Sequence, residues 1–249
     1  MFNKTCMVVM LLISTIIFAN EKQMKLNGAD GPYIYHENGN LRVVSVDSLN
    51  KITDTITTKD TFVCEVENED RDSFTFKLQN EFAITPSHYE KPKKMLAISD
   101  IEGNFNAFYS LLISNKVIDN NLNWVYGAGH LVLVGDFVDR GENVTQCLWL
   151  IYKLDYQSKQ AGGQVHFILG NHEVMTFKAR TRYIAEKYIA LAQQVFAKED
   201  NKLAYKELFS RNSELIRWMK TKNFIEKIGD VIFVHAGLSS DIMNKEMSF

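Results

Sequence analysis

The sequence has few cysteines, no cluster of basic residues and no serine-hydrolase motif. Its three cysteines form no Cys-x-x-Cys pair and no Cys/His cluster, which excludes the usual spacing of a structural zinc site. Lysine and arginine number 28 against 30 aspartates and glutamates, so the net charge is −2 and a nucleic-acid partner is not expected. No Gly-x-Ser-x-Gly elbow supports Ser/His/Asp chemistry.

Residues 1–19 are predicted to be a signal peptide. Residues 6–19 (CMVVMLLISTIIFA) are uninterrupted and apolar, a length that suits a secretory leader and is short for a membrane span. Cleavage is expected near Ala19, although Ile17 is a less favourable residue three positions before the cut. The alternative is an uncleaved anchor, which would be the only membrane association. Either way the protein is expected to be exported, to the periplasm or the extracellular space.

Removal of the leader leaves Cys64 and Cys147 in a compartment where disulfides can form. Cys147 falls in an amphipathic helical pattern and Cys64 in a strand pattern of a different segment. We therefore expect two buried free thiols, not a disulfide.

Residues 20–93 are predicted to form a β-rich extension with a packing role. PYIYHE and LRVVSV flank Asn38-Gly39, a pair that supplies the positive φ angles of a tight hairpin turn. TFVCEVE and SFTFKLQ flank the polar NEDRD and predict a second hairpin. His36 and His88 lie among loop-like residues and are expected to be solvated.

Residues 94–249 alternate between short apolar runs and helical patterns, which predicts an α/β fold. Helices are expected over residues 104–115 and 144–160, and a long helical stretch over residues 180–222. His130 begins one predicted strand and His166 lies inside another, so both are expected to be structural.

Four polar runs each follow a strand-like segment. They are Ser99–Asn104 after MLAI, Gly135–Gly141 after HLVLV, Gly170–Glu173 after QVHFIL, and Val234–Gly237 after DVIFV. Polar side chains at the ends of buried strands converge on one edge of a sheet. Aspartate, asparagine, histidine and glutamate are ligands that divalent metals accept, so a two-metal phosphoesterase centre is predicted.

Two adjacent ions need a bridging carboxylate and flanking ligands to hold a phosphoryl group and activate a water. Asp136 is the natural bridge. Asp100 is assigned to the first ion, and Asn171 and His235 are assigned to the second.

Three further residues lie beside these ligands. Arg140 offers a forked donor to phosphate oxygens. His172 is predicted to protonate the leaving alkoxide, and Asp139 is predicted to orient His172 and to sustain its charge.

The runs GDFVDRG, GNHE and HAG, in this order, resemble the phosphoprotein-phosphatase branch of the calcineurin-like metallophosphoesterases. Arg182-Tyr183 resembles the Arg-Tyr pair that follows GNHE in bacterial and Shewanella-like phosphatases. The resemblance implies a four-layer sandwich, in which two packed mixed β-sheets are flanked by helices. It also implies the same metal ligands and catalytic pair, and it makes Arg182 a candidate phosphate contact beside Arg140.

Two positions depart from the family pattern. The first motif is SDIEG where the family has GDxHG, so Glu102 stands where an imidazole ligand is usual. A carboxylate ligates Mn²⁺, Mg²⁺ or Fe²⁺, either directly or through a water. The family also carries a later metal-binding histidine, but no histidine follows His235. We therefore expect a fold that is incomplete at its C-terminus, either a fragment of a longer protein or a shortened homologue.

The predicted activity is metal-dependent hydrolysis of phosphate esters with two divalent ions, whose identity among Mn²⁺, Fe and Zn²⁺ is left open. The expected substrate is a phosphorylated serine, threonine or tyrosine of a protein. A small phosphate ester or nucleotide is the second enzymatic hypothesis. The third is a catalytically degenerate binding protein, which Glu102 and the missing histidine make worth testing.

Overall fold

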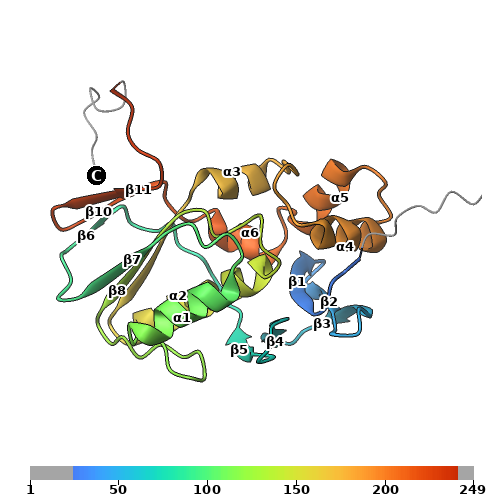
Figure 1. Cartoon of the computed structure of the whole chain (residues 1–249), viewed down its shortest axis with the longest axis horizontal. Coiled ribbons are helices and arrows are strands. Elements are labelled where there is room, and N and C mark those ends of the chain that lie inside the picture. The colour runs from blue at the N-terminus through green and yellow to red at the C-terminus, as the bar shows by residue number, and fades with distance from the viewer. Residues whose placement is uncertain (1–24, 241–249) are drawn as a thin grey trace, which may run out of the picture.

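The structure is a computed structural model that describes residues 25–240 (Figure 1). The predicted signal peptide lies outside these residues, so cleavage, anchoring and export stay predictions. Within the described range no helix is long and apolar enough to cross a membrane.

The N-terminal part forms two small antiparallel sheets, and both predicted hairpins are confirmed. The strands are β1 (Asp30–Glu37), β2 (Asn40–Val46), β3 (Ile52–Thr57), β4 (Thr61–Glu65) and β5 (Ser73–Lys77). The turn between β1 and β2 uses Asn38 and Gly39 at φ 48° and 81°, as the hairpin requires. Strand β3, which pairs with β2, was not predicted because its side chains are mostly exposed.

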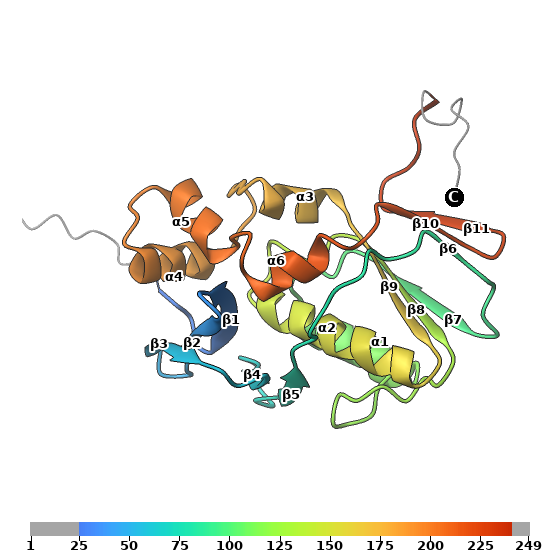
Figure 2. The ribbon, with the colours of Figure 1, turned by 180° about the vertical axis from the view of Figure 1, so that it is seen from behind.

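The following part contains a parallel sheet in the order β7-β8-β9, with two crossover helices. Its elements are β7 (Met95–Ile98), α1 (Phe105–Ser114), β8 (His130–Val134), α2 (Val144–Gln160) and β9 (Gln164–Ile168). Both helices match their predicted positions. In both views α2 lies between the N-terminal strands and the parallel sheet (Figure 1, Figure 2).

A second, mixed sheet packs against the first. Its strands are β6 (His88–Tyr89), β10 (Ile225–Ile228) and β11 (Val231–Val234). Val132, Ile168 and Ile228 form a buried cluster between the two sheets, joined by the partly buried Tyr89 and Phe233. The α/β class is therefore confirmed. The fourth layer and the C-terminal incompleteness stay predictions.

The prediction of a single long helical stretch over residues 180–222 was wrong. After α3 (Asn171–Phe177) the chain forms α4 (Glu186–Phe196), α5 (Asn201–Leu208) and α6 (Glu214–Met219). Ala197 is left-handed at φ 49° and ends α4. The side chains of Asp200 and Ser213 accept the backbone N–H groups of Leu203 and Ile216, so each begins a new helix.

The prediction that His36 lies in a loop was also wrong, whereas its side chain is exposed as expected. His36 lies in β1, and its Nε2 is 2.6 Å from Oε2 of the buried Glu214. This contact joins the first strand to α6, a partner that sequence proximity does not reveal. His88 lies in strand β6, not in a loop, but it is exposed.

The other predicted structural residues are confirmed. Buried His166 is 2.6 Å from Glu226 through Nδ1 and 3.0 Å from His130 through Nε2. Cys64 and Cys147 are buried free thiols, and burial raises the pKa of both.

The N-terminal strands and the α/β part of the chain share one hydrophobic core. Phe76 of β5 stacks on Trp149 of α2 with ring centroids 4.1 Å apart. The Trp149 indole N–H donates to the carbonyl oxygen of Pro32 at 2.8 Å. The domain boundary at residue 93 stays a prediction, but the contacts support the packing role expected for residues 20–93.

We predict that Phe76→Ala lowers the free energy of unfolding of the whole chain by about 3–5 kcal/mol, because it leaves a cavity beside Trp149. The expected urea transition stays single and shifts as a unit. Val63→Ala is the control, since Val63 of β4 is 56% exposed. Two separate transitions, with only one of them moved, would contradict a shared core.

Candidate metal centre

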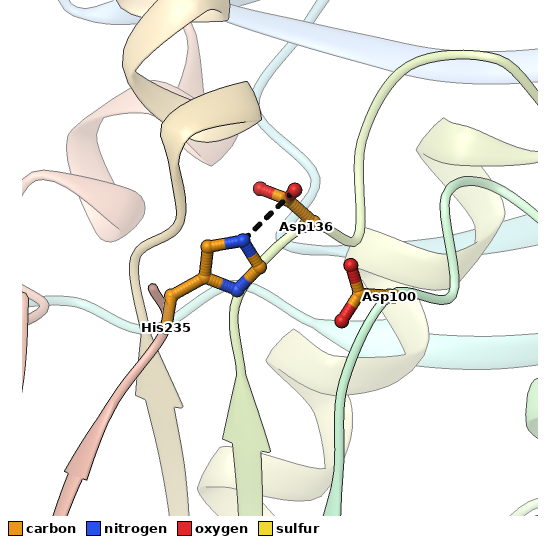
Figure 3. Close-up of side chains that lie close together, drawn as sticks. All are labelled: Asp100, Asp136 and His235. Atoms are coloured by element: carbon orange, nitrogen blue, oxygen red, sulfur yellow. Dashed lines mark ion pairs between the residues drawn. The ribbon is translucent and has the colours of Figure 1, made fainter. Parts of the chain in front are cut away.

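The predicted ligands are brought together at one edge of the parallel sheet. Asp100 lies just beyond β7, Asp136 just beyond β8, Asn171 begins α3 after β9, and His235 follows β11. Figure 3 shows the side chains of Asp100, Asp136 and His235 converging from three separate segments. Their ligand atoms all lie within 4.8 Å of one another. Three of the predicted ligands therefore share one centre, with Asn171 on the adjoining helix.

His235 is oriented through both of its ring nitrogens. Nδ1 is 2.7 Å from the carbonyl oxygen of Val134, and Nε2 is 3.0 Å from Asp136 Oδ2. A ring whose Nδ1–H donates to a carbonyl presents Nε2 as the ligand atom. Burial alone lowers the pKa of His235, but the Val134 carbonyl, Asp136 and Asp100 outweigh it and raise the pKa above its usual value.

Asp136 also belongs to a second group of ligand atoms. The side chains of Glu102, Asp136 and His172 offer atoms that lie within 4.8 Å of one another. One carboxylate shared by two groups has the arrangement needed to bridge two cations. Carboxylate, amide and imidazole donors fit Mn²⁺, Fe or Zn²⁺, so the residues present fit a pair of divalent ions.

The backbone of these loops is held in an unusual conformation. Five non-glycine residues of the predicted site have positive φ: Asp100 at 56°, Glu102 at 47°, Asp136 at 58°, Asp139 at 71° and Arg140 at 58°. Such residues cost about 1–3 kcal/mol each and gather at functional sites. A residue that only caps the start of a helix does not need a positive φ angle. The clustering supports a functional role for both loops.

Glu173 is a positioning residue that the sequence analysis missed. Its buried carboxylate accepts backbone N–H groups from Asp136 at 2.9 Å, Phe137 at 2.8 Å and Gly170 at 2.7 Å. Burial raises the pKa of Glu173, and these three donors oppose that rise. A glutamate in the first turn of a helix is a capping-box signal, which would have indicated the contact with Gly170.

Position 135 must be a glycine because its backbone lies too close to the His235 ring to leave room for a side chain. It has φ +79°, and a Cβ there would lie 2.6 Å from Nδ1 of His235. Any larger residue would push His235 away from Asp136, so the spacing of the two ligands depends on the missing side chain.

The predicted catalytic pair is formed. His172 Nδ1 is 2.8 Å from Asp139 Oδ2, and both side chains are buried. The backbone N–H of His172 donates to Asp136 Oδ1 at 3.0 Å, while its Nε2 lies 3.8 Å from Asp136 Oδ2. Burial raises the pKa of Asp139, and the bond to His172 opposes the rise. The pair therefore stands beside the shared carboxylate.

The two predicted phosphate-binding arginines lie near the same tyrosine. Arg140 and Arg182 place their guanidinium carbons 5.6 Å and 5.1 Å from the centroid of the Tyr183 ring. The backbone N–H of Arg140 donates to the Tyr183 carbonyl at 2.8 Å. Arg140 Nη1 lies 2.6 Å from Glu102 Oε1. Glu102 therefore contacts an arginine as well as facing the candidate metal ligands.

A groove of about 580 Å³ adjoins the centre. Its lining residues are Asn171, Met175, Ala179, Arg180, Thr181, Arg182, Tyr183 and Lys202. Three of them are cationic and none is acidic. The groove thus connects a candidate metal ligand to a positively charged surface.

Residues 93–248 match the family model for calcineurin-like phosphoesterases. The chain belongs to the calcineurin-like phosphoesterase family. Members of this family use a divalent metal pair, in agreement with the ligand groups around Asp136.

Similar proteins support the predicted branch of this family. The chain is 33% identical over 109 residues to Shewanella-like protein phosphatase 2 of Arabidopsis thaliana, covering 44% of this chain and 27% of that protein. It is 27% identical over 146 residues to Shewanella-like protein phosphatase 1 of Plasmodium berghei, covering 59% and 39%. The crystal structure of the cold-active protein-tyrosine phosphatase of a psychrophilic Shewanella species aligns with TM-score 0.75 and 33% identity, covering 88% of this chain and 64% of that one. The chain therefore spans less than two thirds of each relative.

We predict that Glu173→Gln lowers the free energy of unfolding by about 1–3 kcal/mol, because the amide group turns an N–H toward backbone donors that lose their acceptor. Mn²⁺ affinity is expected to fall as the Asp136 loop loosens. Urea unfolding and isothermal titration calorimetry measure the two effects. Glu186→Gln in the first turn of α4 is the exposed control. Equal stability of the two variants would contradict the positioning role.

Proposed function

We propose that the protein is a metal-dependent phosphomonoesterase. The observation that carries this proposal is the position of Asp136, whose carboxylate is shared by two groups of ligand atoms. It also lies between the imidazole of His235 and the His172–Asp139 pair. A bridging carboxylate beside a proton donor suits phosphate-ester hydrolysis better than simple metal storage.

The metal pair would be held by Asp100, Asp136, Asn171 and His235, with Glu102 facing it. When bound, such a pair supplies positive charge that polarises a phosphoryl group and lowers the pKa of a water. The protein's own residues orient the ester around that charge.

His172 acts on the leaving group. Its Nδ1 is held by Asp139 at 2.8 Å, which leaves Nε2 facing the centre. The Asp139 carboxylate stabilises the positive charge of the protonated His172 ring. The proton at Nε2 then passes to the departing alkoxide. Arg140 and Arg182 are placed to bind the phosphate oxygens.

We predict that Asp136→Asn lowers both Mn²⁺ affinity and hydrolysis of p-nitrophenyl phosphate by at least about 100-fold, because the shared ligand loses its charge. Calorimetry and a colour assay of the purified chain, with added Mn²⁺, measure these effects. Asp70→Asn is the control, since Asp70 is exposed between β4 and β5. Retained metal affinity and turnover in Asp136→Asn would refute the bridging role.

His172→Asn separates proton donation from metal binding. Mn²⁺ affinity is expected to stay within a few fold, while kcat falls by about 10²–10⁴ on phenyl phosphate. The loss on p-nitrophenyl phosphate should be smaller, because its leaving group needs less protonation. Equal losses on both esters would contradict the role of His172 as the acid.

We favour a phosphorylated protein side chain over a small phosphate ester as the substrate. The groove of about 580 Å³ extends beyond the candidate ligand Asn171 to Lys202, so it has room for residues that flank a phosphorylated one. The three similar proteins described above are named as protein phosphatases, which supports this preference. Another similar protein is named as a symmetrical bis(5'-nucleosyl)-tetraphosphatase, which supports the nucleotide hypothesis. Because the groove carries Arg180, Arg182 and Lys202, acidic flanking residues are expected to bind best.

We predict that Lys202→Glu lowers the preference for an acidic over a basic phosphotyrosine peptide by about two- to tenfold, the range for reversing one exposed charge. The ratio of kcat/KM for the two peptides measures it, and added salt should weaken it. Lys206→Glu is the matched control on α5, exposed and outside the groove lining. Turnover of p-nitrophenyl phosphate should not change. The same loss in both variants would contradict a role of the groove.

The non-enzymatic alternative rests on Glu102, which replaces a usual imidazole ligand. A degenerate binding protein would bind Mn²⁺ and phosphate without turnover of any ester. The assays above distinguish it from the phosphatase.

A further inference from the structure

The Glu102 carboxylate faces two kinds of positive charge. On one side its Oε1 and Oε2 lie 2.6 Å and 2.7 Å from Arg140 Nη1. On the other side it belongs to the ligand group with Asp136 and His172, whose atoms lie within 4.8 Å of one another. A carboxylate has one negative charge and a limited number of lone pairs. A metal ion bound beside Asp136 and His172 would therefore weaken the ion pair between Glu102 and Arg140.

The backbone fixes this arrangement. The Glu102 N–H donates to the Asp136 carbonyl at 2.9 Å, and the Glu102 carbonyl accepts the N–H of Gly141 at 2.8 Å. Arg140 is tied to Tyr183 by its own N–H. The two loops therefore hold the backbones of Glu102 and Arg140 close together, within reach of an ion pair between their side chains.

We propose that Arg140 and a divalent ion compete for Glu102, so that metal binding releases Arg140 for phosphate. The inference rests on the proposed metal centre and describes its regulation. Without metal, Glu102 neutralises the arginine and stands where an approaching phosphate would meet a negative charge. With metal, Glu102 is shared with the cation and the guanidinium fork faces the phosphate. Metal and phosphate then assist each other through this one side chain.

The side chain at position 102 decides whether this coupling exists. An imidazole, which the family motif usually carries here, is an acceptable metal ligand but brings no negative charge to pair with Arg140. The competition is therefore a property of the glutamate in this chain. Since the Arg140 side chain is 55% exposed, solvent limits its strength to about a two- to fivefold change in affinity.

The first test measures Mn²⁺ affinity of the full chain by calorimetry in a double-mutant cycle. Arg140→Met should raise the affinity about two- to fivefold more in the wild-type background than in the Glu102→Gln or Glu102→His background. Arg182→Met is the matched control, because Arg182 lies near the same tyrosine ring and makes no ion pair with Glu102 in residues 25–240. It reports the general effect of removing one positive charge.

An equal gain from Arg140→Met in all backgrounds would overturn the proposal, because it would show only a change in local charge. No gain would also overturn it. Absence of Mn²⁺ binding to every protein, wild type included, would instead refute the proposed metal centre. Thermal unfolding of each variant confirms that it is folded.

The second test uses inorganic phosphate and chain treated with a chelator. Glu102→Gln should raise phosphate affinity about two- to fivefold, since Arg140 is no longer neutralised. The gain should disappear when Arg140→Met is added, and it should persist with Arg182→Met. Unchanged phosphate affinity in Glu102→Gln would show that the ion pair does not restrain Arg140 and would overturn the proposal.

Discussion

A buried carboxylate holding three backbone N–H groups is the contact on which the centre depends. Glu173 lies on α3, and its donors come from the loop after β8 and from the residue before the helix. Without that acceptor, the three donors would be buried and unpaired, which costs more than the bonds themselves contribute. The contact therefore locks the Asp136 loop to α3, and with it the position of the shared ligand relative to His172.

Each acidic side chain of the centre has a different kind of partner, and this distinguishes their roles. Glu173 is satisfied by backbone donors and Asp139 by His172, whereas Glu102 pairs with an exposed arginine, Arg140, with which a cation can compete. Asp136 contacts the imidazole of His235 and the N–H of His172, and Asp100 faces the same place. The fully satisfied carboxylates position other groups. The partly satisfied ones are those with capacity left to bind a cation.

The features that could be predicted from the sequence are local ones. The Asn38-Gly39 turn and helices α1 and α2 were predicted because turn chemistry and periodicity act over a few residues. The convergence of Asp100, Asp136 and His235 followed from their places at strand ends. The contacts of Glu173 with Asp136 and Phe137, and of Glu102 with Arg140, could not be predicted, since these partners lie far along the chain on a loop whose positive φ angles no residue type demands. The long helix failed because Asp200 and Ser213 act as caps, which periodicity alone does not register.

The exchange of an imidazole for Glu102 changes the charge that phosphate meets. A neutral imidazole beside Arg140 would leave one positive charge there, whereas the Glu102–Arg140 pair leaves none. Because Arg140 is present, its positive charge can act on phosphate once a cation binds Glu102 and weakens the Glu102–Arg140 ion pair. The proposed competition therefore predicts that phosphate binding depends more steeply on metal in this protein than in a relative with histidine at this position. A substitution that looks like damage to a metal ligand thus changes how two binding events are linked.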